Sequence, residues 1–193
     1  MARTFKRGQA VMCFEGKTGK RCYFGGKMGA YRVLSSMPNV ESGWCIPLSN
    51  VDRMVFPAPN EDGSFDRSVC NVIEYRADRS FFVRLEYVQT GPEAWAIGHS
   101  LRVGDTREAS PAVAHQAYST LDEAITQVLS PILRGLASLA AGADNPFVKP
   151  GGKNTALQRR ARDAMYHLLN ALSTHLRNAI VMSLLGRTGD SDG

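Results

Sequence analysis

The sequence predicts an α+β fold, in which a small antiparallel β-barrel is followed by a three-stranded antiparallel sheet with a covering helix and then by a long C-terminal helix. Three observations support this prediction. Short apolar segments alternate with glycine turns in the first 56 residues, β-branched and aromatic residues gather between 69 and 103, and apolar residues recur at helical spacing after residue 120. Runs of strands followed by runs of helices are typical of α+β proteins.

The barrel is predicted from five short segments rich in β-forming residues, at 9–15, 20–24, 30–35, 43–47 and 54–56. Glycines mark the turns between them: Gly16, Gly19, Gly25, Gly26 and Gly29. Strands spaced about ten residues apart favour a small barrel over a sandwich, which needs more strands. We therefore expect a first domain over 1–56.

This segment resembles the SH3-like or KOW-type small barrels in three places. These are the opening Gly8-Gln9-Ala10-Val11, a glycine-flanked basic hairpin, and the ending Trp44-Cys45-Ile46-Pro47-Leu48-Ser49-Asn50-Val51. The resemblance covers about a quarter of the chain. It implies a binding module and leaves the ligand open, because such barrels commonly bind nucleic acid, peptides or modified side chains.

A second domain is predicted over 65–142, after a stretch at 56–64 that contains prolines, acidic residues and glycine. Its strands are expected at 69–76, 80–89 and 94–103, and residues 104–119 are expected to form a polar connection. The sequence from Thr120 to Glu123 has the form of a capping box and predicts the start of a helix that extends to about residue 141. Pro131 should kink this helix or restart it with Ser130 as the new N-cap.

A third segment, 153–186, is predicted to be one long helix from about Thr155 to Leu185. Its apolar stripe consists of Leu157, Ala161, Met165, Leu168, Leu172, Leu176, Ile180 and Leu184. Such a helix would be about 45 Å long. We expect it to pack on the second domain or to form a homodimer with a second copy.

The charge is unevenly distributed along the chain. Residues 1–55 contain nine Lys and Arg against three Asp and Glu, whereas residues 56–113 contain six against nine. The whole chain has a net charge of +5. The basic N-terminal part is therefore expected to meet a polyanion.

Two groups of basic and aromatic residues are candidates for nucleic-acid binding. The first lies around the turns of the predicted barrel, where positive charge stands next to rings that could stack on bases: Lys17, Lys20, Arg21, Tyr23, Lys27, Tyr31 and Arg32. The second lies at the start of the long helix, where the helix dipole attracts anions: Lys153, Arg159, Arg160 and Arg162.

The sequence predicts no catalytic residue, metal site or cofactor. Cys13, Cys22, Cys45 and Cys70 lack the close spacing of a zinc knuckle and are expected to be reduced thiols. A zinc-stabilised module built on the first three is a third hypothesis. Nucleophile motifs, a P-loop and a paired-histidine motif are absent from the sequence. With neither a signal peptide nor a membrane span recognised, a cytoplasmic protein is expected.

The resulting hypothesis is a non-catalytic nucleic-acid-binding accessory protein that holds the phosphate backbone through its basic N-terminal barrel. The alternative is a protein-binding adaptor or inhibitor, of bacterial or phage type, whose basic lobe docks on an acidic partner.

Overall fold

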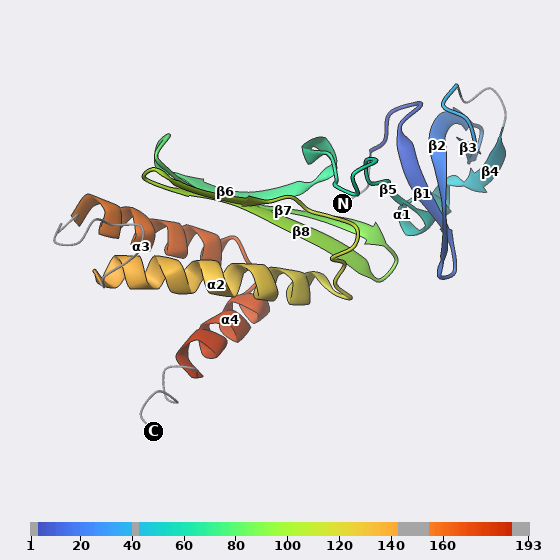
Figure 1. Cartoon of the computed structure of the whole chain (residues 1–193). Helices are drawn as coiled ribbons and strands as arrows, with labels where there is room; N and C mark the ends of the chain where they lie inside the picture. The colour runs from blue at the N-terminus through green and yellow to red at the C-terminus, as the bar shows by residue number, and fades with distance from the viewer. Residues whose placement is uncertain (1–3, 40–42, 143–154, 187–193) are drawn as a thin grey trace. The chain divides into compact units, whose positions relative to one another are not determined.

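The computed structural model describes residues 4–39, 43–142 and 155–186, and it confirms the α+β class (Figure 1). Two antiparallel sheets of five and four strands precede the three long helices. The strands are β1 (Ala10–Glu15), β2 (Thr18–Met28), β3 (Tyr31–Ser35), β4 (Trp44–Pro47), β5 (Val55–Pro57), β6 (Asn71–Arg76), β7 (Phe81–Gly91), β8 (Ala94–Val103) and β9 (Thr106–Ser110). The helices are α1 (Val51–Met54), α2 (Leu121–Ala141), α3 (Thr155–Asn170) and α4 (Thr174–Gly186), with 3-10 turns at Leu48–Asn50 and Arg67–Val69.

By its internal contacts the chain divides into two compact units. Unit 1 comprises Met1–Cys70, Val88–Ala96 and Val113–Thr120, and unit 2 comprises Asn71–Tyr87, Ile97–Ala112 and Leu121–Gly193. The end of the β7–β8 hairpin therefore belongs to unit 1.

The sheet of unit 1 has the strand order β4-β3-β2-β1-β5. Each of the five strands was predicted from the sequence, and the observed bounds differ by a few residues, most in β2. One side of the sheet covers an apolar core formed by Val11, Cys13, Cys22, Phe24, Leu34, Ile46, Val51 and Val55.

The predicted closed barrel is wrong in one respect, because the sheet stays open. In the part of the chain that the structure describes, no ladder joins β4 to β5. β4 pairs only with β3, and the three residues of β5 pair with β1. The 3-10 turn and α1 separate these short strands, and Val51 of α1 fills the core.

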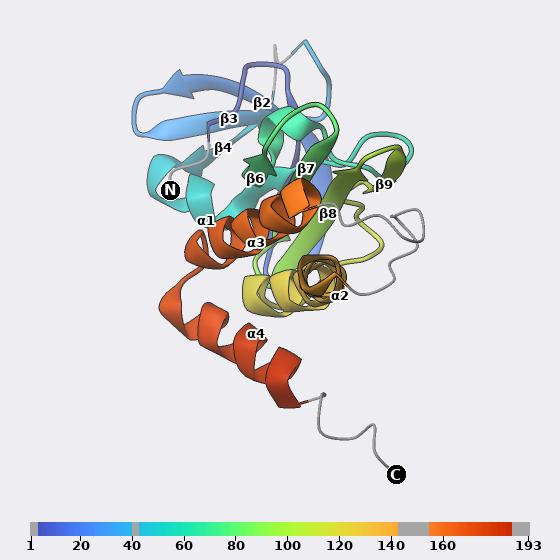
Figure 2. The same ribbon diagram turned by 90° about the vertical axis from the view of Figure 1, so that its left-hand side faces the viewer.

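The sheet of unit 2 has the order β6-β7-β8-β9. Figures 1 and 2 show α2 and α3 against the same face of this sheet. Strand β7 alternates as a half-covered strand should, since the side chains on its helix side are fully buried: Phe81, Val83 and Leu85. Helix α2 packs against α3 and α4, and α3 packs against β6.

Strand β9 lies where the sequence predicted a polar connection. Gly104 and Asp105 form a two-residue turn between Val103 and Thr106, which are paired, and Gly104 has a φ of +61°. The strand itself, Thr-Arg-Glu-Ala-Ser, is polar because it lies at the sheet edge. A glycine-aspartate pair between two extended segments is a hairpin signal that the sequence analysis overlooked.

Helix α2 passes through Pro131 without a break and has the predicted bounds. Among the described helices it alone is long and apolar enough to cross a membrane by length and composition. Seven of its residues are buried in the structure, as in a core helix.

The predicted C-terminal helix is divided into α3 and α4 by a break at residues 171–173. The Ser173 hydroxyl accepts a hydrogen bond from the backbone N–H of Leu176 (3.3 Å), which caps α4. The Arg177 Nε donates to the carbonyl of Leu169 (2.9 Å), which satisfies an acceptor at the end of α3. The apolar stripe continues through the break, with Leu172 and Leu176 both buried, and for this reason the spacing alone predicted one helix.

The close approach of the chain to Gly98 gives a stability test. A Cβ at Gly98 would lie 2.3 Å from the backbone N of Ala112 and 2.6 Å from the Ser110 carbonyl oxygen. Gly98→Ala should lower the free energy of unfolding by about 1–3 kcal/mol, measured by urea denaturation followed by circular dichroism.

Gly135→Ala is the matched control, since its Cβ meets no atom within 4 Å and it lies inside a helix. It should raise the free energy of unfolding by about 1 kcal/mol. A Gly98→Ala protein as stable as the parent would contradict the packing of residues 110–112 over β8.

Candidate nucleic-acid interface

The strand register separates the predicted barrel residues onto two sides of the unit 1 sheet. Lys20 is paired with Cys13, which faces the core, whereas the next residue, Arg21, is paired with Met12 on the opposite side. Tyr23 follows on the side of Arg21. Lys17 stands in the exposed turn between β1 and β2.

At the other end of the sheet, Lys27 is paired with Arg32, and Arg32 is paired with the buried Ile46. Tyr31, which is 48% exposed, points to the opposite side from Arg32. The structure therefore does not gather the predicted lysines, arginines and tyrosines on one face.

Three of these basic side chains already have partners within unit 1. The Lys20 Nζ lies 5.1 Å from the ring centroid of Trp44. The Arg21 Nη1 donates to the carbonyl of Pro59 (2.8 Å). The Arg32 guanidinium lies over the ring of Phe24 at 4.5 Å. An anion would have to compete with these contacts, which leaves Lys17 and Lys27 as the exposed barrel lysines without a described partner.

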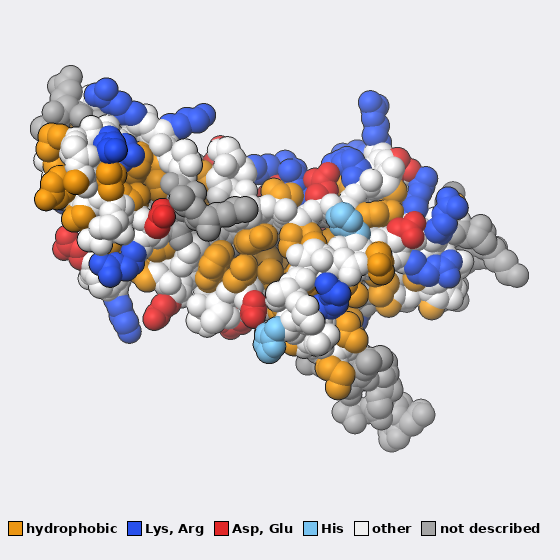
Figure 3. Space-filling model, turned by 180° about the vertical axis from the view of Figure 1, so that it is seen from behind, with side chains coloured by type: hydrophobic (Ala, Val, Ile, Leu, Met, Phe, Trp, Pro, Cys, Tyr) orange, Lys and Arg blue, Asp and Glu red, His pale blue; other side chains and the backbone are white. Residues whose placement is uncertain are grey.

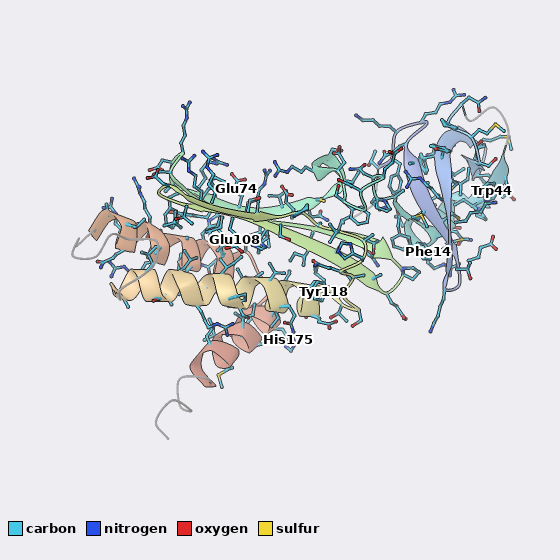
Figure 4. The ribbon with its side chains drawn as sticks, viewed as in Figure 1. Phe14, Trp44, Glu74, Glu108, Tyr118 and His175 are labelled. Atoms are coloured by element: carbon cyan, nitrogen blue, oxygen red, sulfur yellow. The ribbon has the colours of Figure 1, made fainter. Side chains whose placement is uncertain are left out.

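A shallow hollow of about 670 Å³ lies beside Trp44 (Figure 4). Its lining combines Lys20 with Glu15, Thr18 and Cys13. The Glu15 carboxylate opposes the binding of a phosphate there.

The predicted arginines of α3 are only partly available. Arg160 forms an ion pair with Asp78 (2.5 Å). The hydroxyl and the backbone N–H of Ser80 lower the pKa of Asp78, and Arg160 lowers it further. The carboxylate therefore stays charged at neutral pH and holds Arg160.

Arg159 and Arg162 are exposed on α3, and Lys153 lies outside the described residues. Figure 3 shows Lys and Arg side chains, with acidic ones among them, at the end of unit 2 where α3 and the β6–β7 turn lie. Because α3 covers the helix side of the sheet, these two arginines do not share a face with residues on the sheet's outer side.

The outer side of the unit 2 sheet carries an arginine on every strand: Arg76 of β6, Arg84 of β7, Arg102 of β8 and Arg107 of β9. Their orientation follows from the register. Arg76 is paired with Phe82, which alternates with the buried residues of β7. Arg102 is paired with Arg107 and alternates with Val103, which is buried.

The β6–β7 half of this outer face is nearly neutral. Glu74 binds Arg76 through one carboxylate oxygen (2.9 Å) and Arg84 through the other (3.1 Å; Figure 4). The buried Glu86 lies 3.3 Å from the Nε of Arg84. The Arg76 guanidinium also covers the Phe82 ring at 4.5 Å. These contacts pair the carboxylates with arginines and place one guanidinium over an aromatic ring.

The β8–β9 half carries unbalanced positive charge. Arg102 and Arg107 stand directly opposite each other on neighbouring strands, where like charges are destabilising. The Arg102 Nε donates to the carbonyl of Gly104 (3.1 Å). Within the described ranges no carboxylate lies at ion-pair distance from either arginine. An anion between the two guanidinium groups would relieve this repulsion.

This outer face is not evident from the sequence unless β9 is predicted. In the prediction, Arg107 lay in the polar connection and Arg102 at the end of a strand. The hairpin signal at Gly104 and Asp105 was the one feature that could have placed the two arginines opposite each other.

The described residues contain no group of three or more His, Cys, Asp or Glu side chains that could hold a metal ion. Cys13 and Cys22 are buried on neighbouring strands, and Cys45 is exposed on β4. Burial raises the pKa of Cys22 to about 11 and also raises the pKa of Cys13. Both buried thiols are thus protonated and unreactive at neutral pH.

The reactivity of the thiols should follow their exposure, which is high for Cys45 and low for Cys13 and Cys22. With iodoacetamide at about pH 8, Cys45 should be alkylated first, and Cys13 and Cys22 should react only after urea unfolds the chain. Peptide mapping by mass spectrometry measures the order. Early alkylation of Cys22 in the folded protein would show that the β1–β2 pair opens readily.

Comparison of the chain with protein-family models, with curated proteins and with solved structures finds no match in any of the three.

Proposed function

We propose that the protein is a non-catalytic nucleic-acid-binding protein whose main contact surface is the outer face of the β6–β9 sheet. The observation that carries the proposal is the Arg102–Arg107 pair. Two guanidinium groups held side by side on a sheet, with no carboxylate of the described chain beside them, favour a phosphate between them.

The rest of the outer face supports the same ligand. The Arg76 guanidinium, which lies over the Phe82 ring, provides a flat group on which a base can stack, and Arg84 is held in place by Glu74. A sheet face with aromatic and guanidinium planes suits unstacked bases, because every base has a face that can stack. The net charge of +5 and the basic N-terminal part add long-range attraction for a polyanion.

The basic residues of unit 1 contribute less to nucleic-acid binding in this proposal than they do in the hypothesis drawn from the sequence. Lys17 and Lys27 can strengthen binding to a long polymer, while Lys20, Arg21 and Arg32 already make contacts within unit 1.

The proposal is tested by fluorescence anisotropy of labelled single-stranded and duplex DNA and RNA over a salt series. The double variant Arg102→Ala with Arg107→Ala should lose most of its affinity, and the slope of log K against log salt should fall by about two. This loss is expected because each arginine releases about one counterion on contact with a phosphate.

The matched control is the double variant Lys17→Ala with Lys27→Ala, which removes the same charge from exposed positions of unit 1. It should weaken binding only slightly. If this control loses the affinity and the sheet variant keeps it, the barrel is the binding surface and the assignment to the β6–β9 face is wrong.

A second candidate is the protein-binding adaptor or inhibitor, and one observation favours it. The residues of α4 from Ala179 to Leu185 are apolar except for Ser183, and Met182 is 68% exposed although Ile180 is fully buried. The outward side of α4 could therefore seat a partner helix or a second copy. Substitutions of Leu172 or Leu176 would not test such a contact, because both side chains are buried within the fold.

Met182→Glu tests this candidate. If α4 forms the seam of a homodimer, light scattering coupled to gel filtration should show a dimer for the parent chain and a monomer for the variant, because burial of a lone carboxylate is costly. Tyr166→Glu, at a 75% exposed position of α3, is the control and should leave the mass unchanged. A parent chain that is monomeric at high concentration would exclude the homodimer.

A further inference from the structure

Unit 2 contains a pocket between α2 and the helix side of β8 and β9. This pocket is separate from the outer face of the β6–β9 sheet. It encloses about 310 Å³, and most of its lining is apolar. Leu101 and Val103 line it from the sheet, and Leu136 and Leu139 line it from α2. The Arg102–Arg107 pair points to the other side of the same strands, so the two sites are independent.

The pocket exists because α2 presents little side-chain bulk at this point. Gly135 and Pro131 both line it, and a Cβ at Gly135 would meet no atom within 4 Å. A glycine inside a helix lowers stability by about 1 kcal/mol relative to alanine. Val128 and Ile132, on the same side of the helix, are only half-buried. An ordinary core helix would fill this space.

The polar groups of the pocket include two hydrogen-bond acceptors, the Glu108 carboxylate and the backbone carbonyl of Gln127. The Nε2 of His99 lies 3.0 Å from a carboxylate oxygen of Glu108 (Figure 4). Pro131 has no N–H, and the backbone carbonyl of Gln127 therefore cannot receive its usual helical hydrogen bond. The Gln127 residue lines the pocket beside Pro131.

The charge of the rim is negative. The Glu108 side chain is 61% exposed while that of His99 is 17% exposed, which places the carboxylate at the solvent side of the pair. A carboxylate beside an apolar pocket attracts a cation and repels an anion. The exposed Glu108 carboxylate and the Gln127 carbonyl, which lacks its helical donor, favour a ligand head that donates hydrogen bonds.

We propose that this pocket binds a small apolar molecule that carries a protonated amine. The apolar body occupies the space over Gly135, and the ammonium group lies at the rim, where it donates to Glu108. A cavity of about 150 Å³ accommodates benzene. The larger volume of this pocket suits a fused two-ring system or a chain of similar size.

The test uses three naphthalene probes that differ only in the head group: 1-naphthylmethylamine, 1-naphthaleneacetic acid and 1-methylnaphthalene. Binding to the full-length protein is followed by chemical-shift changes in ¹H–¹⁵N spectra. The amine should bind about tenfold more tightly than either of the other two, as expected for one hydrogen bond to a charged group. The largest shifts should fall on residues of α2, β8 and β9.

Variants of the same protein decide whether this pocket is the site. Gly135→Leu should abolish amine binding, since the leucine fills the space, and it should not unfold the chain because leucine favours a helix. Glu108→Gln should remove the preference for the amine and keep binding of 1-methylnaphthalene. Ser138→Leu, an exposed position of α2 outside the pocket lining, should bind the amine as the parent does.

Several results would overturn the proposal: no binding of the amine at millimolar concentration, equal binding of the acid, or amine binding that survives Gly135→Leu. Each of these results would overturn the amine-binding proposal whether or not the protein binds nucleic acid. The Arg102→Ala and Arg107→Ala changes lie on the opposite side of the strands and should leave amine binding unchanged.

Discussion

The alternation of side chains in the β6–β9 sheet is the constraint on which unit 2 depends. Because successive residues of a strand point to opposite faces, the helices that cover Phe81, Val83 and Leu85 leave the intervening residues on the side that faces away from the helices. A shift of one residue in register would exchange the two faces and bury the arginines. The same alternation therefore determines the core, the outer arginines and the pocket beneath α2.

Much of the fold could be predicted from the sequence because local signals agreed with the tertiary structure. β8 has its predicted bounds, Ala94–Val103, since a turn and a run of β-forming residues both mark it. The break between α3 and α4 could not be predicted. It is held by the contact of Arg177 with the Leu169 carbonyl, eight residues earlier, and by burial of apolar residues on both sides of the break.

The candidate site was harder to predict than the fold, because charge along the chain does not show which charges are already paired. The N-terminal segment is the more basic by sequence, yet Lys20 and Arg32 lie over aromatic rings. Residues 56–113 have an acidic excess by sequence, yet Glu74 and Glu86 are paired with arginines and leave Arg102 and Arg107 unbalanced. Strand register and ion pairing decide which charged side chains are left without a partner, and neither can be obtained from composition.

The passage of residues 110–112 over Gly98 covers one end of the outer sheet face. The sheet is four strands wide, about 14 Å at the usual spacing between strands. A four-stranded sheet of this width accommodates two or three stacked bases. On the proposed function, one copy of the chain would thus contact a long nucleic acid over a short length. Tight binding would then require two linked copies, such as a homodimer, because linkage raises the effective concentration of the second contact.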